Sequence, residues 1–238
     1  MTHKTKLGRR EALVGILGAG GVLAAGTAAA QPPRRVGVAV ATTTAAAPLK
    51  RPNSYYYGPD GKFDEAKAKE AVLAMLRAAN YPISENLKQN MWVADFGLGR
   101  FAEVGLGGMF WVNNQQDNYT SLEMFLLPDQ MIPEHWHVPL PDQKVPVKME
   151  SWHVRWGSTY TYGGGEPTAK LAVKIPESEA EFVTVRKEKM LKVGEVTGIT
   201  KPEEKHWQQA GPQGAIITET STFHSGAAVR FTNPKIKF

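Results

Sequence analysis

The chain has 238 residues, which is enough for one sizeable domain or two small ones. Its formal charge of +5 suggests an anionic partner at first, but four basic residues and one glutamate lie in residues 1–30. The rest carries 24 basic and 22 acidic residues, so composition gives no support to nucleic-acid binding. The absence of cysteine excludes disulfides, thiolate zinc sites, iron–sulfur clusters and cysteine nucleophiles. Chemistry must therefore come from histidines, carboxylates and lysines.

Residues 1–30 have the form of a cleavable export signal. A basic head ends in Arg9-Arg10, an apolar run of small residues covers 12–26, and an Ala-x-Ala-like end covers 28–30. The paired arginines favour the twin-arginine route, and the Gly- and Ala-rich run is too weakly apolar for a good membrane anchor. We expect a mature protein that is periplasmic or extracellular and does not span a membrane.

The mature chain divides into three parts. Residues 31–53 are rich in Pro, Ala and Thr without periodicity, which predicts a disordered tether. Residues 54–90 form a helical extension, because apolar residues recur at helical spacing over 64–80 and a short helical turn is expected at 84–90. The domain that follows covers 91–238.

Short runs of β-branched and aromatic residues alternate with Gly, Pro, Asn and Asp throughout this last part, which is typical of strands. The expected strands are 109–113, 121–127, 131–137, 147–156, 158–163, 181–186, 189–193, 205–209, 214–221 and 227–231. Their spacing of about ten residues predicts an antiparallel sandwich or small barrel. The fold class is therefore all-β with an N-terminal helical extension.

Four side chains of this β-rich part suit a metal ion. His135 and His137 are two apart on one expected strand, so both imidazoles project from the same face, about 6–7 Å apart at Cα. Glu150 opens the next strand, with Lys148 on the same face, and His206 lies on another strand. Three imidazoles and one carboxylate fit a borderline divalent ion and leave positions open for water or substrate.

Other polar and aromatic residues have alternative interpretations. Glu123 and Glu134 are the other candidate carboxylates. His153 has the opposite parity to Glu150, so we place it on an outer face or a dimer contact, and we expect His224 on a surface turn. The tryptophans expected mainly in the barrel core are Trp136, Trp152, Trp156 and Trp207.

Four stretches carry a family resemblance: QMIPEHWH (130–137), KME (148–150), HWQQAGPQGAIITETS (206–221) and FTNPKI (231–236). In these the chain resembles the cupin superfamily, and more narrowly the D-lyxose isomerase-like group of sugar isomerases. The resemblance covers residues 109–238 and implies a cupin-type antiparallel β-barrel, or jelly-roll.

The resemblance also implies roles for particular residues. The implied metal ligands are His135, His137, Glu150 and His206, and the implied polar groups facing the substrate are Lys148 and Glu219. Twelve residues separate His137 from Glu150, which departs from the general cupin spacing, and Gln208 stands where the group often has an aromatic residue. Either Lys148 or Glu219 could be the catalytic base, or the two could simply pair with each other or face solvent.

The activity implied is a metal-dependent aldose–ketose isomerisation of a small free sugar such as D-lyxose, through an enediol. The alternatives are a metal-dependent cupin dioxygenase and a non-catalytic cupin that binds metal or sugar. Manganese is the first choice of metal, because the twin-arginine route exports folded proteins with their ion already bound; iron, nickel and zinc remain open. We expect a homodimer, since cupin barrels often pair.

Overall fold

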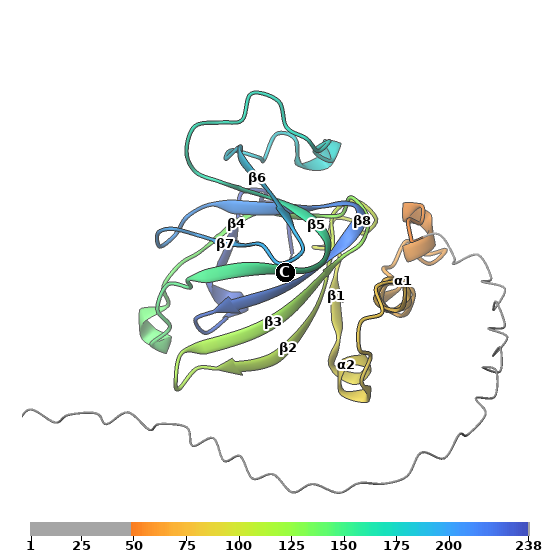
Figure 1. Cartoon of the computed structure of the whole chain (residues 1–238), viewed down its shortest axis with the longest axis horizontal. Helices are drawn as coiled ribbons and strands as arrows, with labels where there is room; N and C mark the ends of the chain where they lie inside the picture. Colours follow the sequence, from red (N-terminus) through yellow and green to blue (C-terminus); the bar gives the residue numbers. More distant parts are fainter. Residues whose placement is uncertain (1–48, 238) are drawn as a thin grey trace, which may run out of the picture. The chain divides into compact units, whose positions relative to one another are not determined.

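The computed structural model describes residues 49–237 (Figure 1). The expected export signal and most of the expected tether lie outside the described residues. Leu49, near the end of that tether, packs against the helical core, and a short 3-10 helix, η1 (Asn53–Tyr56), follows. Among the described residues, no helix has the length and apolar character needed to cross a membrane.

The N-terminal extension contains two α-helices, α1 (Glu65–Ala78) and α2 (Glu85–Asn90), close to the ranges expected from the sequence. Asp64 and Ser84 cap them, because each side chain accepts a hydrogen bond from the backbone N–H three residues further on. The buried face of α1 carries its apolar residues at helical spacing. Local capping and periodicity thus account for both helices.

The described residues beyond the helices form a nine-stranded sheet that curls into a cupin-type β-barrel, which confirms the expected fold class (Figure 1). Every ladder between named strands is antiparallel. The strands are β1 (Trp92–Ala94), β2 (Leu106–Asn114), β3 (Tyr119–Leu126), β4 (Met131–His137), β5 (Glu150–Gly163), β6 (Lys187–Lys192), β7 (Val196–Gly198), β8 (His206–Ser221) and β9 (Val229–Phe231). Further 3-10 helices are η2 (Pro141–Gln143), η3 (Glu177–Glu179) and η4 (Gly226–Ala228).

Strand β8 organises the barrel. Along one edge its C-terminal half pairs with β3 and its N-terminal half with β4, while β5 pairs with it along the other edge. Alternate residues of β8 therefore point into the barrel or out of it. Ala215 and Ile217 join the inner core, whereas Ile216 faces the helices.

Two pairs of strands expected from the sequence are each one strand. The ranges 147–156 and 158–163 merge into β5, and 205–209 and 214–221 merge into β8. Gly157 and Gly214 have positive φ angles of 70° and 94° at the junctions, and a Cβ on Gly157 would lie only 2.0 Å from the Gly214 carbonyl oxygen. These glycines form bulges within continuous strands instead of turns. β1 and β7 were not predicted from the sequence, because three residues are too few to show an alternating pattern.

The strand expected at 181–186 is wrong. Val183 and Val185 pack against the buried Trp207 from an irregular loop. The backbone N–H groups of Thr184 and Val185 donate to the carboxylate of Glu134, at 2.6 and 2.9 Å. The Glu134 carboxylate thus accepts the backbone hydrogen bonds that the carbonyl groups of a neighbouring strand would otherwise accept. The segment therefore alternates apolar and polar residues without being a strand.

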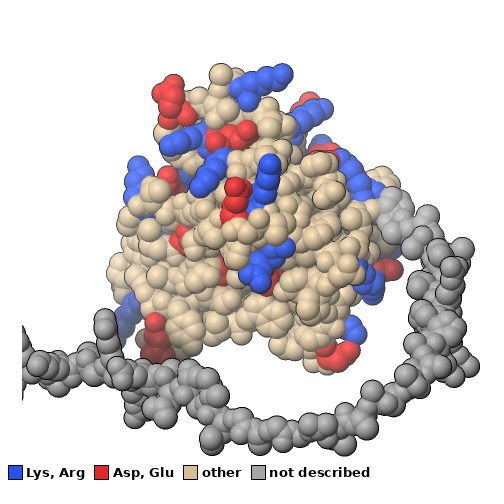
Figure 2. All heavy atoms as spheres, in the orientation of Figure 1, with Lys and Arg blue, Asp and Glu red and all other residues tan. Residues whose placement is uncertain are grey.

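The helical extension covers the outer face of the sheet. Val72, Met75 and Leu76 of α1 belong to one core with Phe125 and Ile216. α1 therefore packs on the outside of the sheet. On the face seen in Figure 2, basic and acidic side chains are interspersed.

Glu134 gives a test of how this loop is held. Its buried carboxylate also accepts from the hydroxyls of Thr184 and Thr232, each at 2.6 Å. We predict that Glu134→Gln lowers the free energy of unfolding by about 2 kcal/mol, because hydrogen bonds to a charged group are lost. The matched control, Glu181→Gln on a side chain that is 70% exposed, should change it by less than about 0.5 kcal/mol. Equal midpoints for both variants in urea titrations would contradict this role.

Candidate functional site

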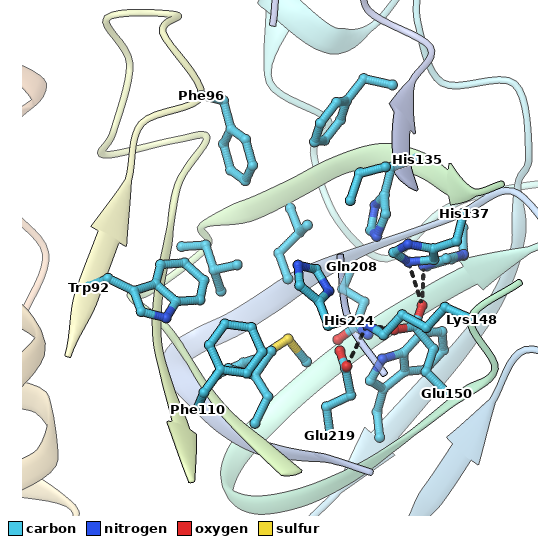
Figure 3. A pocket seen from close by; sticks show the side chains of 18 residues that line it. Trp92, Phe96, Phe110, His135, His137, Lys148, Glu150, Gln208, Glu219 and His224 are labelled. Atoms are coloured by element: carbon cyan, nitrogen blue, oxygen red, sulfur yellow. Dashed lines mark hydrogen bonds and ion pairs between the residues drawn. The ribbon is translucent and has the colours of Figure 1, made fainter. Parts of the chain in front are cut away.

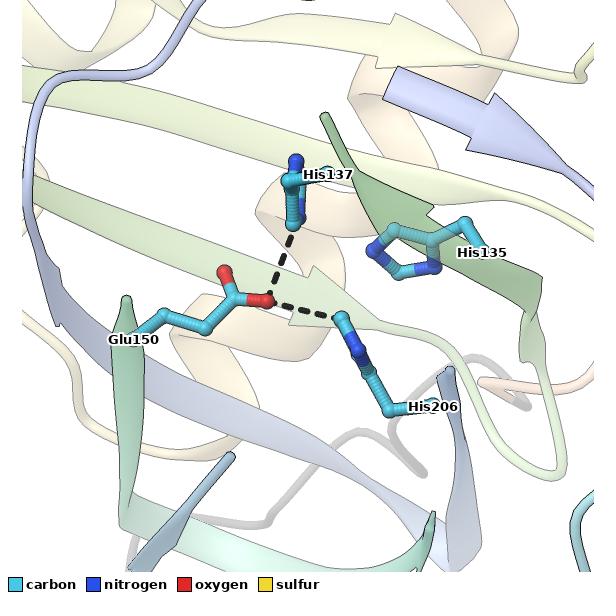
Figure 4. A group of neighbouring side chains, drawn as sticks. All are labelled: His135, His137, Glu150 and His206. Atoms are coloured by element: carbon cyan, nitrogen blue, oxygen red, sulfur yellow. Dashed lines mark ion pairs between the residues drawn. The ribbon is translucent and has the colours of Figure 1, made fainter. Parts of the chain in front are cut away.

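The four side chains singled out as metal ligands meet at one point (Figure 4). His135 and His137 come from β4, Glu150 begins β5, and His206 begins β8. One ligand atom from each lies within 4.8 Å of all the others. Glu150 Oε1 is 2.7 Å from His206 Nε2 and 3.2 Å from His137 Nε2. His135 lies opposite His206 in the β4–β8 ladder, and the curl of the sheet brings Glu150, which pairs with Ser221, to the same point.

The cluster fits a bound cation. His137 Nε2, His206 Nε2 and Glu150 Oε1 are buried, and none has a hydrogen bond of good geometry with the described residues, despite the short separations. Ligand atoms about 2.1–2.2 Å from an ion lie at most about 4.4 Å apart, so small shifts would bring all four atoms into range. Buried polar atoms without partners are unfavourable, and an ion would satisfy them together.

Two of the imidazoles are oriented by backbone carbonyl groups. Nδ1 of His135 lies 2.9 Å from the carbonyl oxygen of Pro133, and Nδ1 of His206 lies 2.8 Å from that of Glu204. If each Nδ1–H donates to its carbonyl, each Nε2 keeps a lone pair for the cluster. This support from neighbouring backbone could not be predicted from the spacing of the histidines.

Electrostatics keep the carboxylate ionised. Burial raises the pKa of Glu150, but Lys148, His137 and His206 lower it more, and the net pKa is well below its ordinary value. Burial lowers the pKa of His135 well below 6.5 and also lowers that of His137. Burial opposes the charged form of His206 as well, but Glu150 and the Glu204 carbonyl outweigh it and raise the pKa of His206. The anionic carboxylate and the neutral imidazoles of His135 and His137 have the protonation state that a divalent ion requires, and His206 would release its proton when the ion binds.

Lys148 and Glu219 form a buried pair beside the cluster. The Lys148 ammonium lies 2.6 Å from Glu150 Oε2 and 2.5 Å from Glu219 Oε1. Burial lowers the pKa of Lys148, but the two carboxylates outweigh it and raise the net value, so the amine is charged. Burial raises the pKa of Glu219 to about 7, with Lys148 opposing and Glu150 adding to the shift.

The cluster lines a cavity of about 330 Å³ inside the barrel (Figure 3). One side carries the histidines, Glu150, Lys148 and Glu219. The remaining wall is largely apolar and includes Trp92, Phe96, Phe110, Trp152 and Phe231. A cavity of this size, apolar with a few convergent polar groups, suits a small ligand.

Several residues lie where the sequence did not place them. His224, expected on the surface, lines the cavity, with its ring centroid 6.2 Å from that of His137. Burial lowers the pKa of His224 to about 3, and Lys148 and His137 add to the effect, so its imidazole is neutral. Trp152, expected in the core, is buried and also lines the cavity. Alternation along β2 and β9 could have indicated Phe110 and Phe231, but nothing in the sequence indicated Trp92 on its three-residue strand.

The alternative carboxylates lie elsewhere. Glu123 accepts hydrogen bonds from Tyr81 and Thr218 outside the cavity, and Glu134 holds the loop described above. His153 contacts Arg155 at 3.3 Å and does not line the cavity, in agreement with its parity. Glu150 is therefore the carboxylate placed with the three histidines.

Known proteins resemble this chain over most of its length, although no protein-family model matches it. A D-lyxose ketol-isomerase of Cohnella laeviribosi is 37% identical over 171 residues, which are 72% of this chain and 91% of that protein. A D-lyxose ketol-isomerase of Thermofilum sp. is 36% identical over 72% of this chain and 92% of its own. A D-lyxose/D-mannose isomerase of Thermosediminibacter oceani is 38% identical over 71% of this chain and 90% of that protein.

Solved structures share the fold at low sequence identity. An L-ribose isomerase of Acinetobacter sp. superposes with a TM-score of 0.57 at 14% identity, over 76% of this chain and 95% of that one. An L-ribose isomerase of Cellulomonas parahominis gives a TM-score of 0.55 at 13% identity, over 76% of this chain and 95% of that one. With the fold, the cluster and the curated relatives in agreement, this chain belongs to the D-lyxose ketol-isomerase family of cupin sugar isomerases.

Proposed function

We propose that this protein is a metal-dependent isomerase that interconverts the aldose and ketose forms of a small free sugar such as D-lyxose. One observation carries the proposal: a convergent set of three imidazoles and one carboxylate shares a cavity with the Lys148–Glu219 pair. The names of the curated relatives, D-lyxose and D-lyxose/D-mannose isomerases, support the substrate class.

His135, His137, Glu150 and His206 are the residues that would hold a divalent ion. Such an ion supplies Lewis-acid polarisation of the sugar carbonyl and its neighbouring hydroxyl. We propose manganese, with iron, nickel and zinc as the alternatives. An N/O site loaded outside the cytoplasm would favour copper or zinc, whereas export of the folded protein retains a weaker ion bound earlier.

Glu219 and Lys148 divide the proton transfers between them. A charged ammonium has no lone pair to accept a proton, so we assign the base to Glu219, whose raised pKa suits a proton acceptor near neutral pH. Glu219 takes the proton from C2 while Lys148 gives one to O1, which produces the enediol. Glu219 then returns its proton to C1 and Lys148 takes the proton of the O2 hydroxyl, which produces the ketose.

The rival functions use the site less completely. A cupin dioxygenase would need an iron or copper centre but no ammonium–carboxylate pair, and a non-catalytic cupin would need neither group of the pair. Incubation of the metal-loaded protein with D-lyxose and D-mannose separates them. Ketose formation supports the isomerase, oxygen consumption the dioxygenase, and saturable binding without turnover the non-catalytic protein.

Removal of the carboxylate ligand tests the donor set. We predict that Glu150→Ala weakens Mn²⁺ binding about a hundredfold or more, because it removes the anionic ligand of the cluster. Metal content after dialysis and calorimetric titration give the measurement, and His153→Ala, outside the cavity, is the control. Wild-type metal content together with wild-type activity in Glu150→Ala would show that the ligand assignment is wrong.

Removal of the base should stop chemistry without loss of metal. We predict that Glu219→Gln lowers kcat by about a hundredfold to ten-thousandfold, the usual contribution of a positioned acid–base group. Metal content should stay at the wild-type level, since Glu219 is not in the cluster. Glu123→Gln, an outward-facing carboxylate on the neighbouring strand, should keep its kcat. A wild-type kcat in Glu219→Gln would transfer the base role to another group.

We further propose that the protein is exported by the twin-arginine route and works as a homodimer. The support for export is the basic head with Arg9-Arg10, followed by a weakly apolar run. We predict that the double substitution Arg9→Lys and Arg10→Lys retains the precursor in the cytoplasm, as measured by cell fractionation and immunoblotting. Unchanged export of this variant would exclude the twin-arginine route.

A further inference from the structure

The cavity also contains polar atoms that the proposed chemistry does not use. The rings of His137, His224, Phe110 and Trp92 follow one another, with successive centroids 6.2, 5.3 and 6.0 Å apart. Figure 3 shows His224 between Phe110 and the polar cluster. This row leads from the cluster to the apolar wall formed by Trp92 and Phe110.

Three polar atoms on the cavity wall are buried and lack a hydrogen-bond partner among the described residues. They are Trp92 Nε1, Gln208 Oε1 and His224 Nδ1. Gln208 is 2% exposed and follows His206 by two residues, so both side chains face the cavity. A cation in the cluster would satisfy His206 and its neighbours, but an indole N–H cannot bind a cation. Trp92 therefore needs a different partner, and Gln208 and His224 are not among the four clustered ligand residues.

The hydrogen bonds that these three atoms can donate or accept indicate hydroxyl groups as their partners. An indole N–H only donates a hydrogen bond, and an amide oxygen only accepts one. A carboxylate or phosphate could satisfy Trp92 but not Gln208 Oε1, because it only accepts. Lys148 is the only Lys or Arg among the residues that line the cavity, and it is engaged by Glu150 and Glu219. The wall therefore suits an uncharged molecule with several hydroxyl groups.

His224 is also held in place from outside the cavity. Its backbone N–H donates to Asn113 Oδ1 at 3.0 Å and to Thr120 Oγ1 at 3.2 Å, and its carbonyl accepts from Asn113 Nδ2 at 3.0 Å. The side chains of Asn113 and Thr120 bond each other as well. Strands β2 and β3 thus fix the turn that carries His224, which reduces the conformational entropy lost when a ligand binds.

We propose that Trp92, Gln208 and His224 form a subsite that binds the sugar hydroxyls on carbons beyond the reacting pair. The subsite sets KM and the preference among sugars, while the cluster and Glu219 carry the chemistry. This inference rests on the proposed isomerase function and assigns the part of the substrate that the reaction leaves unchanged.

The test uses His224→Phe and Gln208→Leu, which keep side-chain bulk but remove the hydrogen-bonding atoms. Each should raise the KM for D-lyxose about tenfold, the effect of one neutral hydrogen bond, with kcat within about threefold and metal content unchanged. His224→Asn, which places a polar atom near the Nδ1 position, should restore most of the affinity. The control His153→Phe, on the outer face of the barrel, should keep the wild-type KM.

A second measurement separates hydrogen bonding from packing. Among singly deoxygenated D-lyxose analogues, the one lacking the hydroxyl bound by His224 should show a raised KM with the wild-type protein but no further rise with His224→Phe. Wild-type KM values in both His224→Phe and Gln208→Leu would overturn the subsite. If the effects of deoxygenation and of His224→Phe on KM were additive for every analogue, the assignment of His224 would be overturned.

The wild-type protein distinguishes a failure of the isomerase proposal from a failure of the subsite. If it converts neither D-lyxose nor D-mannose, the isomerase proposal fails, and the subsite is then decided by calorimetric binding of D-lyxose. Weaker binding by His224→Phe than by His153→Phe would support the subsite. Equal binding by the two variants, or no binding by the wild type, would overturn it.

Discussion

The buried carboxylate of Glu150 is the constraint on which the site depends. A carboxylate inside an apolar barrel is strongly unfavourable unless it is paired with hydrogen-bonding or charged groups. Here Lys148, His137 and His206 surround it, and all four side chains are at least nine-tenths buried. The arrangement is stable only as a set, because removal of one partner leaves an uncompensated charge. An ion held by the same atoms would complete this set and bring His135 into it.

The barrel provides the geometry that this set requires. His135 lies opposite His206 in the β4–β8 ladder, whereas Glu150 pairs with Ser221 at the far end of β8. Glu150 therefore meets His206 through the curl of the sheet and not through a neighbouring ladder position. Strand alternation directs the reactive groups inward and leaves the opposite faces free for packing against α1 and the 164–186 loop. The charged groups thus gather at one end of a largely apolar cavity, and in our proposal the reacting carbons of the sugar lie against them.

The sequence predicted those features that depend on strand alternation. The pair His135 and His137 and the outward position of His153 follow directly from it, and the two helices follow from capping and helical spacing. The longer-range features could not be predicted in this way. His224 reaches the cavity because Asn113 and Thr120 hold its turn, and Gly157 continues a strand because it packs against Gly214. The alternating segment near Val183 is a loop because Glu134 satisfies its backbone. Each exception depends on a partner that is distant in sequence.

In our proposal, three imidazoles and one carboxylate hold a single cation in this barrel. Anomalous X-ray diffraction from crystals of the purified protein, collected at the absorption edge of the metal found in it, tests this most directly. We expect one strong peak within about 2.3 Å of the ligand atoms of His135, His137, Glu150 and His206. A peak bound by other side chains, or a fully ordered cluster without a peak in an active enzyme, would contradict it.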